Sequence, residues 1–252
     1  MSQDHEYINQ KEMNVVDHLS ELRNRLIITA IFFIILFITA FTLRDVIYGF
    51  FEQSIEFDLY ITSPGDIIWV YLMMSGLVAI IGTLPILSLQ IWLFIKPGLT
   101  ASERRISVTY IPAVFLLFVG GLVFGYFMFI NLILPFLLSL NDGMFTELFT
   151  VEKYFRFLFQ IIIPFAILFE IPIIIMFLTS LEIITPQFLK KFRKYAYFVL
   201  LIVAALVTPP DIILQIVVAV PLFLLYELSI YLSASVYRKK QKRLLQAEQG
   251  DA

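Results

Sequence analysis

The sequence predicts an all-α integral membrane protein with six transmembrane helices, several of them kinked, that form a bundle with a concave face. Sixty per cent of the 252 residues are apolar and the mean hydropathy is +0.89, which is well above globular composition. Long apolar segments are separated by short polar loops, and the basic residues gather in alternate loops. We therefore expect one membrane domain over residues 1–252, without a sizeable soluble part.

The N-terminal region is expected to stay on the protein and to lead into the first span. Residues 1–25 are polar and mixed in charge, without the short apolar core and cleavage site of a removable signal peptide. Apolar residues recur at helical spacing from Val15 to Leu26, which predicts an amphipathic cytoplasmic lead-in helix on the membrane surface. The first span is expected at 26–43, followed by a short interfacial helix and an extended segment near 57–61.

The second and third spans are expected at 67–95 and 108–138. The third contains Pro135 and a Gly121-x-x-x-Gly125 spacing, which lets another helix approach closely. Packing within the bundle is the expected use of these glycines.

The fourth span, expected at 155–179, carries a carboxylate at its centre, Glu170. An acid at this depth costs about 2.5 to 3.5 kcal/mol on insertion scales, so it normally faces a protein interior and marks a functional path. Pro164 and Pro172 flank it, and each removes a backbone donor, so the helix is expected to be kinked or loosened there. The alternative is a protonated glutamate that is hydrogen-bonded inside the bundle and has no further role.

The last two spans form a tight hairpin, expected at 195–208 and 212–234, with a charged tail at 235–252. The 13 apolar residues from Tyr195 to Val207 reach only about 20 Å, short of a ~30 Å hydrocarbon core.

The basic residues determine the orientation. Fifteen of the 18 Lys and Arg residues lie on the side of the two termini, and the other three are Arg44, Lys153 and Arg156. Positive loops stay in the cytoplasm, so both termini are expected there.

Composition also excludes several chemistries. The chain has no cysteine, which excludes disulfides and thiolate metal sites, and its two histidines, His5 and His18, lie outside the apolar segments. No glycine-rich phosphate loop is present. We expect no enzyme activity, no cofactor and no bound metal.

Further polar candidates lie near the last span. Glu227 falls inside it, where a carboxylate needs a partner or a proton. Asp211 follows two prolines, and capping of the helix that begins at Ile212 is its simplest role. The cationic run from Arg238 to Arg243 is typical of an anchor to anionic lipid.

Two cytoplasmic segments share one membrane face: His18-Leu19-Ser20-Glu21-Leu22-Arg23 and the loop from Pro97 to Arg105. A carboxylate at the surface can bind an arginine guanidinium with two hydrogen bonds, which lysine cannot reproduce. Glu103 in the loop either serves such a ligand or pairs with an arginine of its own loop, which contributes at most ~1 kcal/mol in solvent. The residue types alone leave both interpretations open.

These segments together carry a family resemblance. HLSELRNRL near the N-terminus, PGLTASERR in the first cytoplasmic loop, FEIPI around Glu170 and TPPDIILQ between the final spans resemble the TatC family of twin-arginine protein translocases. The match runs from about residue 14 to 237, and its four motifs agree in order and spacing. The chain departs from the family pattern at Asp66, where a glutamate is expected nearby, and at Leu214, where a serine often precedes the glutamine.

The resemblance implies a receptor that binds twin-arginine signal peptides of folded precursor proteins at the cytoplasmic face of the bacterial cell membrane. It also implies recruitment of TatA-type, and of TatB-type, single-span proteins, self-association, and transport driven by the protonmotive force, with no role for nucleic acid. Glu103 and Glu21 would meet the arginine pair, and Glu170 would line a concave, water-accessible face. The residues that would shape the peptide site are His18, Leu19, Arg23, Arg104 and Arg105. Those on the partner-helix surface would be Thr208, Asp211 and Gln215.

Two other classes compete with this interpretation. A small-solute or ion transporter would use Glu170 and Glu227 as a proton relay, although the sequence shows no internal repeat. An intramembrane hydrolase would need a base beside a serine in a span, and no histidine lies at that depth.

Overall fold

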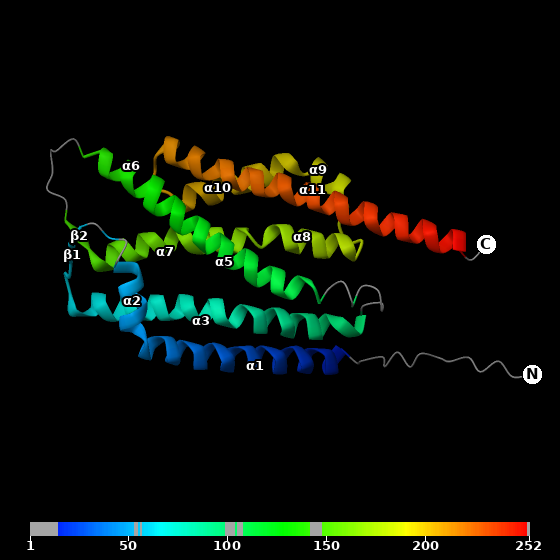
Figure 1. Ribbon diagram of the computed structural model, residues 1–252, viewed down its shortest axis with the longest axis horizontal. Helices are drawn as coiled ribbons and strands as arrows, with labels where there is room; N and C mark the ends of the chain where they lie inside the picture. Colours follow the sequence, from blue (N-terminus) through cyan, green and yellow to red (C-terminus); the bar gives the residue numbers. More distant parts are fainter. Residues whose placement is uncertain are drawn as a thin grey trace, which may run out of the picture.

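The computed structural model of the protein describes residues 15–52, 55, 57–98, 104, 108–141 and 148–250. Helices run roughly along one direction and form an elongated bundle, as Figure 1 shows. The start of α1 and the end of α11 lie at the same end of the bundle, and α2 with the two short strands lies at the other.

The first layer consists of α1 (Val15–Thr42), which packs along α3 (Pro64–Ile95). Helix α1 is continuous and runs from the expected lead-in segment into the expected first span without a break. Its sequence contains no proline or glycine that would interrupt it. The two helices approach closely at Gly82, where an added Cβ would lie 2.9 Å from Leu36 Cδ1.

The end of the bundle away from the termini is closed by α2 (Arg44–Glu52) and a two-stranded parallel sheet of β1 (Leu59–Tyr60) and β2 (Phe149–Thr150). The predicted short helix and extended segment are therefore both present. Asp66, where the chain departs from the family pattern, has a local structural role. Its carboxylate accepts hydrogen bonds from the backbone N–H groups of Thr62 and Ser63 at 3.0 and 2.9 Å. It thereby completes a capping box at the start of α3.

The predicted third span is divided into α5 (Tyr110–Met128), a π-helical turn η2 (Phe129–Ile133) and α6 (Leu134–Ser139). Pro135 lacks a backbone donor, which frees the carbonyl four residues earlier and favours such a change of register. The side chain of Asn131 donates to the carbonyl of Phe127 at 3.0 Å within this turn.

The fourth span breaks where the prolines predict it. Helix α7 (Val151–Leu168) ends before Phe169, and α8 (Ile171–Ser180) begins after Glu170 with Pro172 in its first turn. A single 3-10 turn, η1 (Lys96–Gly98), follows α3. The remaining elements are α9 (Pro186–Lys191), α10 (Arg193–Val207) and α11 (Ile212–Gly250).

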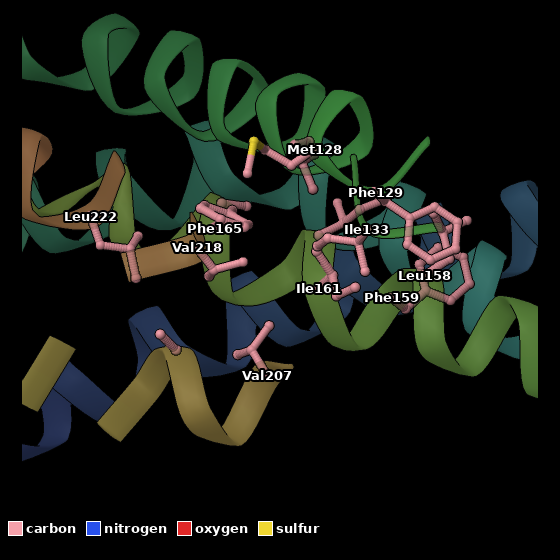
Figure 2. Close-up of a cluster of buried hydrophobic side chains, with 14 of the residues drawn as sticks. Met128, Phe129, Ile133, Leu158, Phe159, Ile161, Phe165, Val207, Val218 and Leu222 are labelled. Carbon is pink, nitrogen blue, oxygen red and sulfur yellow. The ribbon is translucent and has the colours of Figure 1, made fainter. Parts of the chain in front are cut away.

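The core lies where α5, η2, α7, α10 and α11 meet. Figure 2 shows its side chains, with Phe129 and Ile133 of η2 facing Leu158 and Phe159 of α7. The glycines on α5 allow this packing, since a Cβ on Gly121 would lie 2.7 Å from the Cα of Ala166. Core packing, as predicted, is the role of this glycine spacing.

Five helical stretches of the described chain are long and apolar enough to cross a membrane: His18–Thr42, Pro64–Gly98, Tyr110–Ser139, Val151–Ser180 and Ile212–Lys242. The fifth predicted span, at 195–208, corresponds to α10, whose 15 residues reach only about 22 Å at 1.5 Å per residue. The helices follow the predicted order, and α10 and α11 form the short final hairpin.

Candidate functional site

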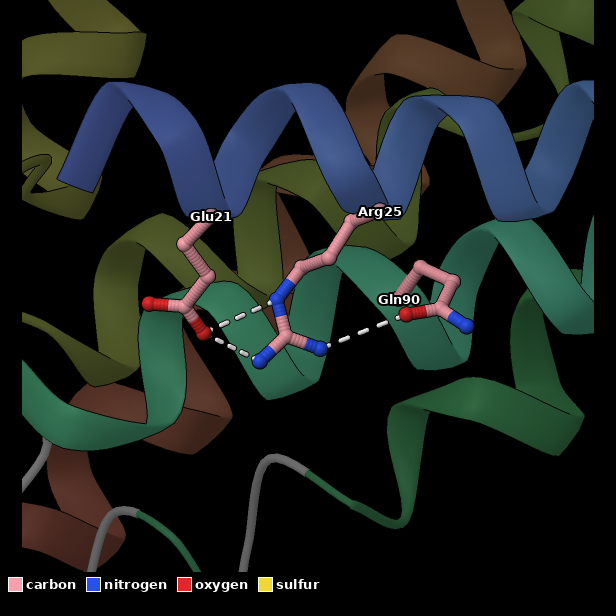
Figure 3. Close-up of polar contacts among 3 residues, drawn as sticks. All are labelled: Glu21, Arg25 and Gln90. Carbon is pink, nitrogen blue, oxygen red and sulfur yellow. Dashed lines mark hydrogen bonds and ion pairs between the residues drawn. The ribbon is translucent and has the colours of Figure 1, made fainter. Parts of the chain in front are cut away.

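The motif at the start of α1 forms a polar cluster with α3. Arg25 donates through Nε to Oε1 of Glu21 at 3.0 Å and through a second guanidinium nitrogen, Nη2, to the same oxygen. Its remaining nitrogen, Nη1, donates to Oε1 of Gln90 at 3.2 Å, and Figure 3 shows the guanidinium between the two partners. The side chains of Arg25 and Glu21 are only 20% and 26% exposed. This cluster therefore joins α1 to α3 at the end of the bundle that carries the termini.

An aromatic contact lies beside this cluster. The rings of His18 and Phe94 are stacked, with centroids 4.2 Å apart and planes inclined by 19°. Phe94 lies near the end of α3, two residues before the turn η1 that leads toward Glu103. The contact thus holds the start of α1 against the end of α3, just before η1.

The structure describes some of the other predicted peptide-site residues and not others. Leu19 and Arg23 are exposed and border a shallow apolar depression on α1, with Leu22 and Leu26 as further walls. Arg104 is exposed. Glu103 and Arg105 lie outside the described residues, so their pairing is not addressed by the structure.

Glu170 borders a cavity of about 300 Å³ between α3, α5 and α8. Both of its carboxylate oxygens are buried and, among the described residues, have no hydrogen-bond partner. Trp92 lines the same cavity, and its indole nitrogen is likewise buried without a hydrogen-bond partner among the described residues. The hydrogen-bonded alternative for Glu170 receives no support from the described residues, since a buried carboxyl without a protein partner needs water or a ligand.

Glu227 has the partner that its position requires. Its Oε2 accepts from Nη2 of Arg193 at 2.6 Å, and its Oε1 accepts from the hydroxyl of Tyr197 at 2.5 Å. Arg193 is the first residue of α10, so Glu227 lies level with the first turn of that helix. Both carboxylate oxygens are engaged in holding α10 against α11.

The polar residues of the final hairpin are mainly used locally. The carboxylate of Asp211 accepts from the backbone N–H of Leu214 at 2.9 Å, which is the predicted helix cap. Thr208 is buried, and its hydroxyl donates to the carbonyl of Ala204 at 2.9 Å. Gln215 is half-buried and its amide donates to the carbonyl of Leu201 at 3.5 Å, which makes it the more accessible of the three sites for a partner.

The cationic tail is partly tied to the bundle. Lys240 donates to the carbonyl of Ser180 at 2.9 Å and lies 3.2 Å from the carboxylate of Glu182. Arg238 and Lys239 are exposed. The tail is therefore an extension of α11 that contacts the end of α8.

Sequence reasoning missed five residues of these clusters: Arg25, Gln90, Phe94, Trp92 and Tyr197. The spacing of Glu21 and Arg25 by four residues is a signal for a helical ion pair. Gln90, Phe94 and Tyr197 lie on different helices from their partners, and Trp92 lies on a different helix from Glu170, whose cavity it lines. Nothing local in the sequence indicates these arrangements.

The comparisons with known proteins agree with one another. The family model described as Sec-independent protein translocase protein (TatC) matches residues 17–221. The TatCd protein of Bacillus subtilis (strain 168) is 42% identical over 235 residues, covering 93% of this chain and 97% of that protein. The TatC protein of Aquifex aeolicus (strain VF5) is 35% identical over 240 residues, covering 91% and 98%.

A solved structure shows the same fold. The crystal structure of a twin-arginine translocase receptor, TatC, superimposes with a TM-score of 0.76 at 34% identity, covering 87% of this chain and 99% of that one. Sequence and fold thus agree along almost the whole length of both chains. This chain belongs to the TatC family of Sec-independent protein translocase proteins.

Proposed function

We propose that this chain is the receptor subunit of a twin-arginine translocase, which binds the signal peptides of folded precursor proteins at the end of the bundle formed by the start of α1 and the first cytoplasmic loop. One observation carries the proposal. A glutamate carboxylate, Glu21, lies at this end in a site that already accommodates an arginine guanidinium, that of Arg25. The described surroundings thus have the shape and polarity that an arginine side chain requires.

The second acceptor in this proposal is Glu103. The stacked rings of His18 and Phe94 fix α1 beside the end of α3, and Glu103 follows Gly98 of η1 by five residues. Two carboxylates from two segments can therefore serve two consecutive arginines. The exposed side chains of Leu19 and Arg23 border the same region of α1, where the apolar part of a peptide can lie.

We further propose that single-span partners of the TatA and TatB type dock on the hairpin of α10 and α11. Helix α10 is shorter than the hydrocarbon core, and a mismatch costs fractions of a kcal/mol per Å, which favours association with another helix. Gln215 supplies a polar contact near the outer end of the hairpin. Assembly with further copies of this chain also belongs to the proposal.

The same proposal places the chain in the bacterial cytoplasmic membrane with both termini in the cytoplasm. The start of α1 and the end of α11 lie at the same end of the bundle. The loops at that end hold most of the basic residues, whereas Arg44, Lys153 and Arg156 lie at the other.

The decisive experiment is a binding titration of the detergent-purified chain with a synthetic signal peptide that carries Arg-Arg, and with the same peptide carrying Lys-Lys. The chain is expected to bind the first and not the second.

Glu103→Gln keeps the shape of the side chain and removes its charge, so affinity should fall by ~1.5 to 3 kcal/mol, ten- to a hundredfold. Glu21→Gln should weaken binding in the same direction. Glu152→Gln, which removes a matched acid at the opposite end of the bundle, is the control. Equal binding of the two peptides would refute the proposal.

A further inference from the structure

The acceptor Glu21 is already occupied by a guanidinium of its own chain. Two nitrogens of Arg25, Nε and Nη2, bind the same carboxylate oxygen, Oε1. The third nitrogen is held 65 residues away in sequence, by Gln90 on α3, so the guanidinium is fixed from both sides (Figure 3). Only a fifth of the Arg25 side chain is exposed, so solvent screens this pair less than a surface pair.

A ligand arginine that binds a carboxylate with two parallel hydrogen bonds uses both carboxylate oxygens. Oε1 of Glu21 is not available for this while it accepts two bonds from Arg25. The charge of Glu21 is also balanced in this state, and Arg23 adds a further positive charge on the same helix. An incoming cationic peptide thus meets no net negative charge on this part of α1.

We propose that Arg25 is an internal competitor that occupies Glu21 in the empty receptor and that an arginine of the signal peptide must displace. The proposal rests on the proposed function, because it assumes that Glu21 accepts a peptide arginine. Displacement exchanges one guanidinium for another at the same carboxylate, so the number of hydrogen bonds to Glu21 is conserved. The bond from Arg25 to Gln90 keeps the released guanidinium attached to α3 instead of leaving it without a partner.

The competitor model predicts whether a substitution at Arg25 raises or lowers the affinity for the peptide. If Arg25 instead positioned Glu21 for the ligand, its removal would weaken peptide binding. If it competes, its removal strengthens binding, and the gain depends on Glu21. A purely structural role predicts neither the gain nor that dependence.

The test compares Arg25→Gln and Arg25→Lys in the full-length, detergent-purified chain, by titration with the Arg-Arg peptide. Arg25→Gln is expected to raise affinity roughly two- to fivefold, the range that corresponds to a partly exposed ion pair of this spacing. Arg25→Lys keeps the charge but cannot bridge Glu21 and Gln90 through a planar fork, so a smaller gain is expected. A gain in Arg25→Gln with none in Arg25→Lys would show a general charge effect and would overturn the proposal.

A double-mutant cycle with Glu21→Gln completes the test. In that background Arg25→Gln should leave affinity unchanged, because there is no carboxylate for which Arg25 competes. An equal gain in both backgrounds, or a loss in the otherwise unaltered chain, would overturn the proposal. Arg156→Gln is the matched control, since Arg156 pairs with Glu152 at the same four-residue spacing at the opposite end of the bundle, and it should not change binding.

A fallback variant and a comparison of the two peptides separate failure of the competitor model from other outcomes. If Arg25→Gln does not give a monodisperse protein, Arg25→Met removes the guanidinium while keeping an unbranched side chain of similar length, and the same Glu21-dependent gain in affinity is expected; no gain would count against the competitor. An unaltered chain that fails to distinguish Arg-Arg from Lys-Lys refutes the proposed function and the competitor with it. Discrimination that persists while the Arg25 variants leave affinity unchanged refutes the competitor alone.

Discussion

The carboxylate of Glu227 on α11 and the guanidinium of Arg193 on α10 meet at 2.6 Å, and the hydroxyl of Tyr197 donates to the other carboxylate oxygen at 2.5 Å. The final hairpin is thus held by a charged contact at the end where α10 begins. This arrangement disfavours the proton-relay transporter, because a relay needs a carboxyl group that is free to exchange protons, whereas both oxygens of Glu227 are engaged. Glu170 borders a separate cavity, to which α11 contributes no residue.

The first prediction concerns this pair. Glu227→Gln should lower the stability of the purified protein, and a double-mutant cycle with Arg193→Gln should give a coupling of about 0.5 to 1 kcal/mol, since the two side chains are 36% and 42% exposed. The coupling is measured from the thermal unfolding of the single and double variants in one detergent. Arg238→Gln, on the same helix, is the control. Loss of proton-driven transport in Glu227→Gln at unchanged stability would instead favour a relay.

The second prediction uses two adjacent glycines on α5. A Cβ on Gly121 would lie 2.7 Å from Cα of Ala166 and 2.9 Å from the carbonyl oxygen of Phe165, so Gly121→Ala must separate α5 from α7. We expect a destabilisation of about 1 to 3 kcal/mol from this overpacking. Gly120→Ala meets no atom within 4 Å and should be neutral or slightly stabilising. Equal unfolding temperatures for the two variants would contradict the close approach of the helices.

The third prediction tests whether water reaches the cavity beside Glu170. A carboxyl group at this depth without a protein partner among the described residues needs water, so a cysteine at position 170 of this cysteine-free chain should react with a water-soluble maleimide. Leu224→Cys, on the exposed apolar face of α11, provides the lipid-facing reference. Labelling at position 170 as slow as at position 224 would show that the cavity is closed to water.

The fourth prediction concerns the short helix α10. Insertion of four leucines after Val203 adds about 6 Å at 1.5 Å per residue and restores the match to the hydrocarbon core. Binding of the Arg-Arg peptide should persist, because its proposed site lies on α1, α3 and the first loop. Crosslinking to a TatA-type helix and transport should fall sharply. Full transport by the lengthened protein would show that the short span is not needed for partner docking.

Much of the fold was predictable because its determinants are local. The order and approximate length of the helices follow from apolar segments that must satisfy their backbone hydrogen bonds internally in a bilayer. The break at Phe169 and Glu170 follows from Pro164 and Pro172, and the π-helical turn lies just before Pro135. The cap at Asp211 was likewise predictable, because a cap joins residues only three apart.

What the sequence alone determined is therefore which segments are helices, where prolines interrupt them, and which acids lie at unusual depths. Only the tertiary structure decided what those acids contact. Glu21 pairs with Arg25 within one turn of α1, but the bond from Arg25 to Gln90 joins two helices. Glu227 is paired because α10 brings Arg193 beside it, and the carboxylate of Glu170 has no hydrogen-bond partner among the described residues because three helices leave a cavity beside it. Each contact between helices depends on their relative rotation and register. These are fixed by side-chain packing across the whole bundle, which no local pattern in the sequence records.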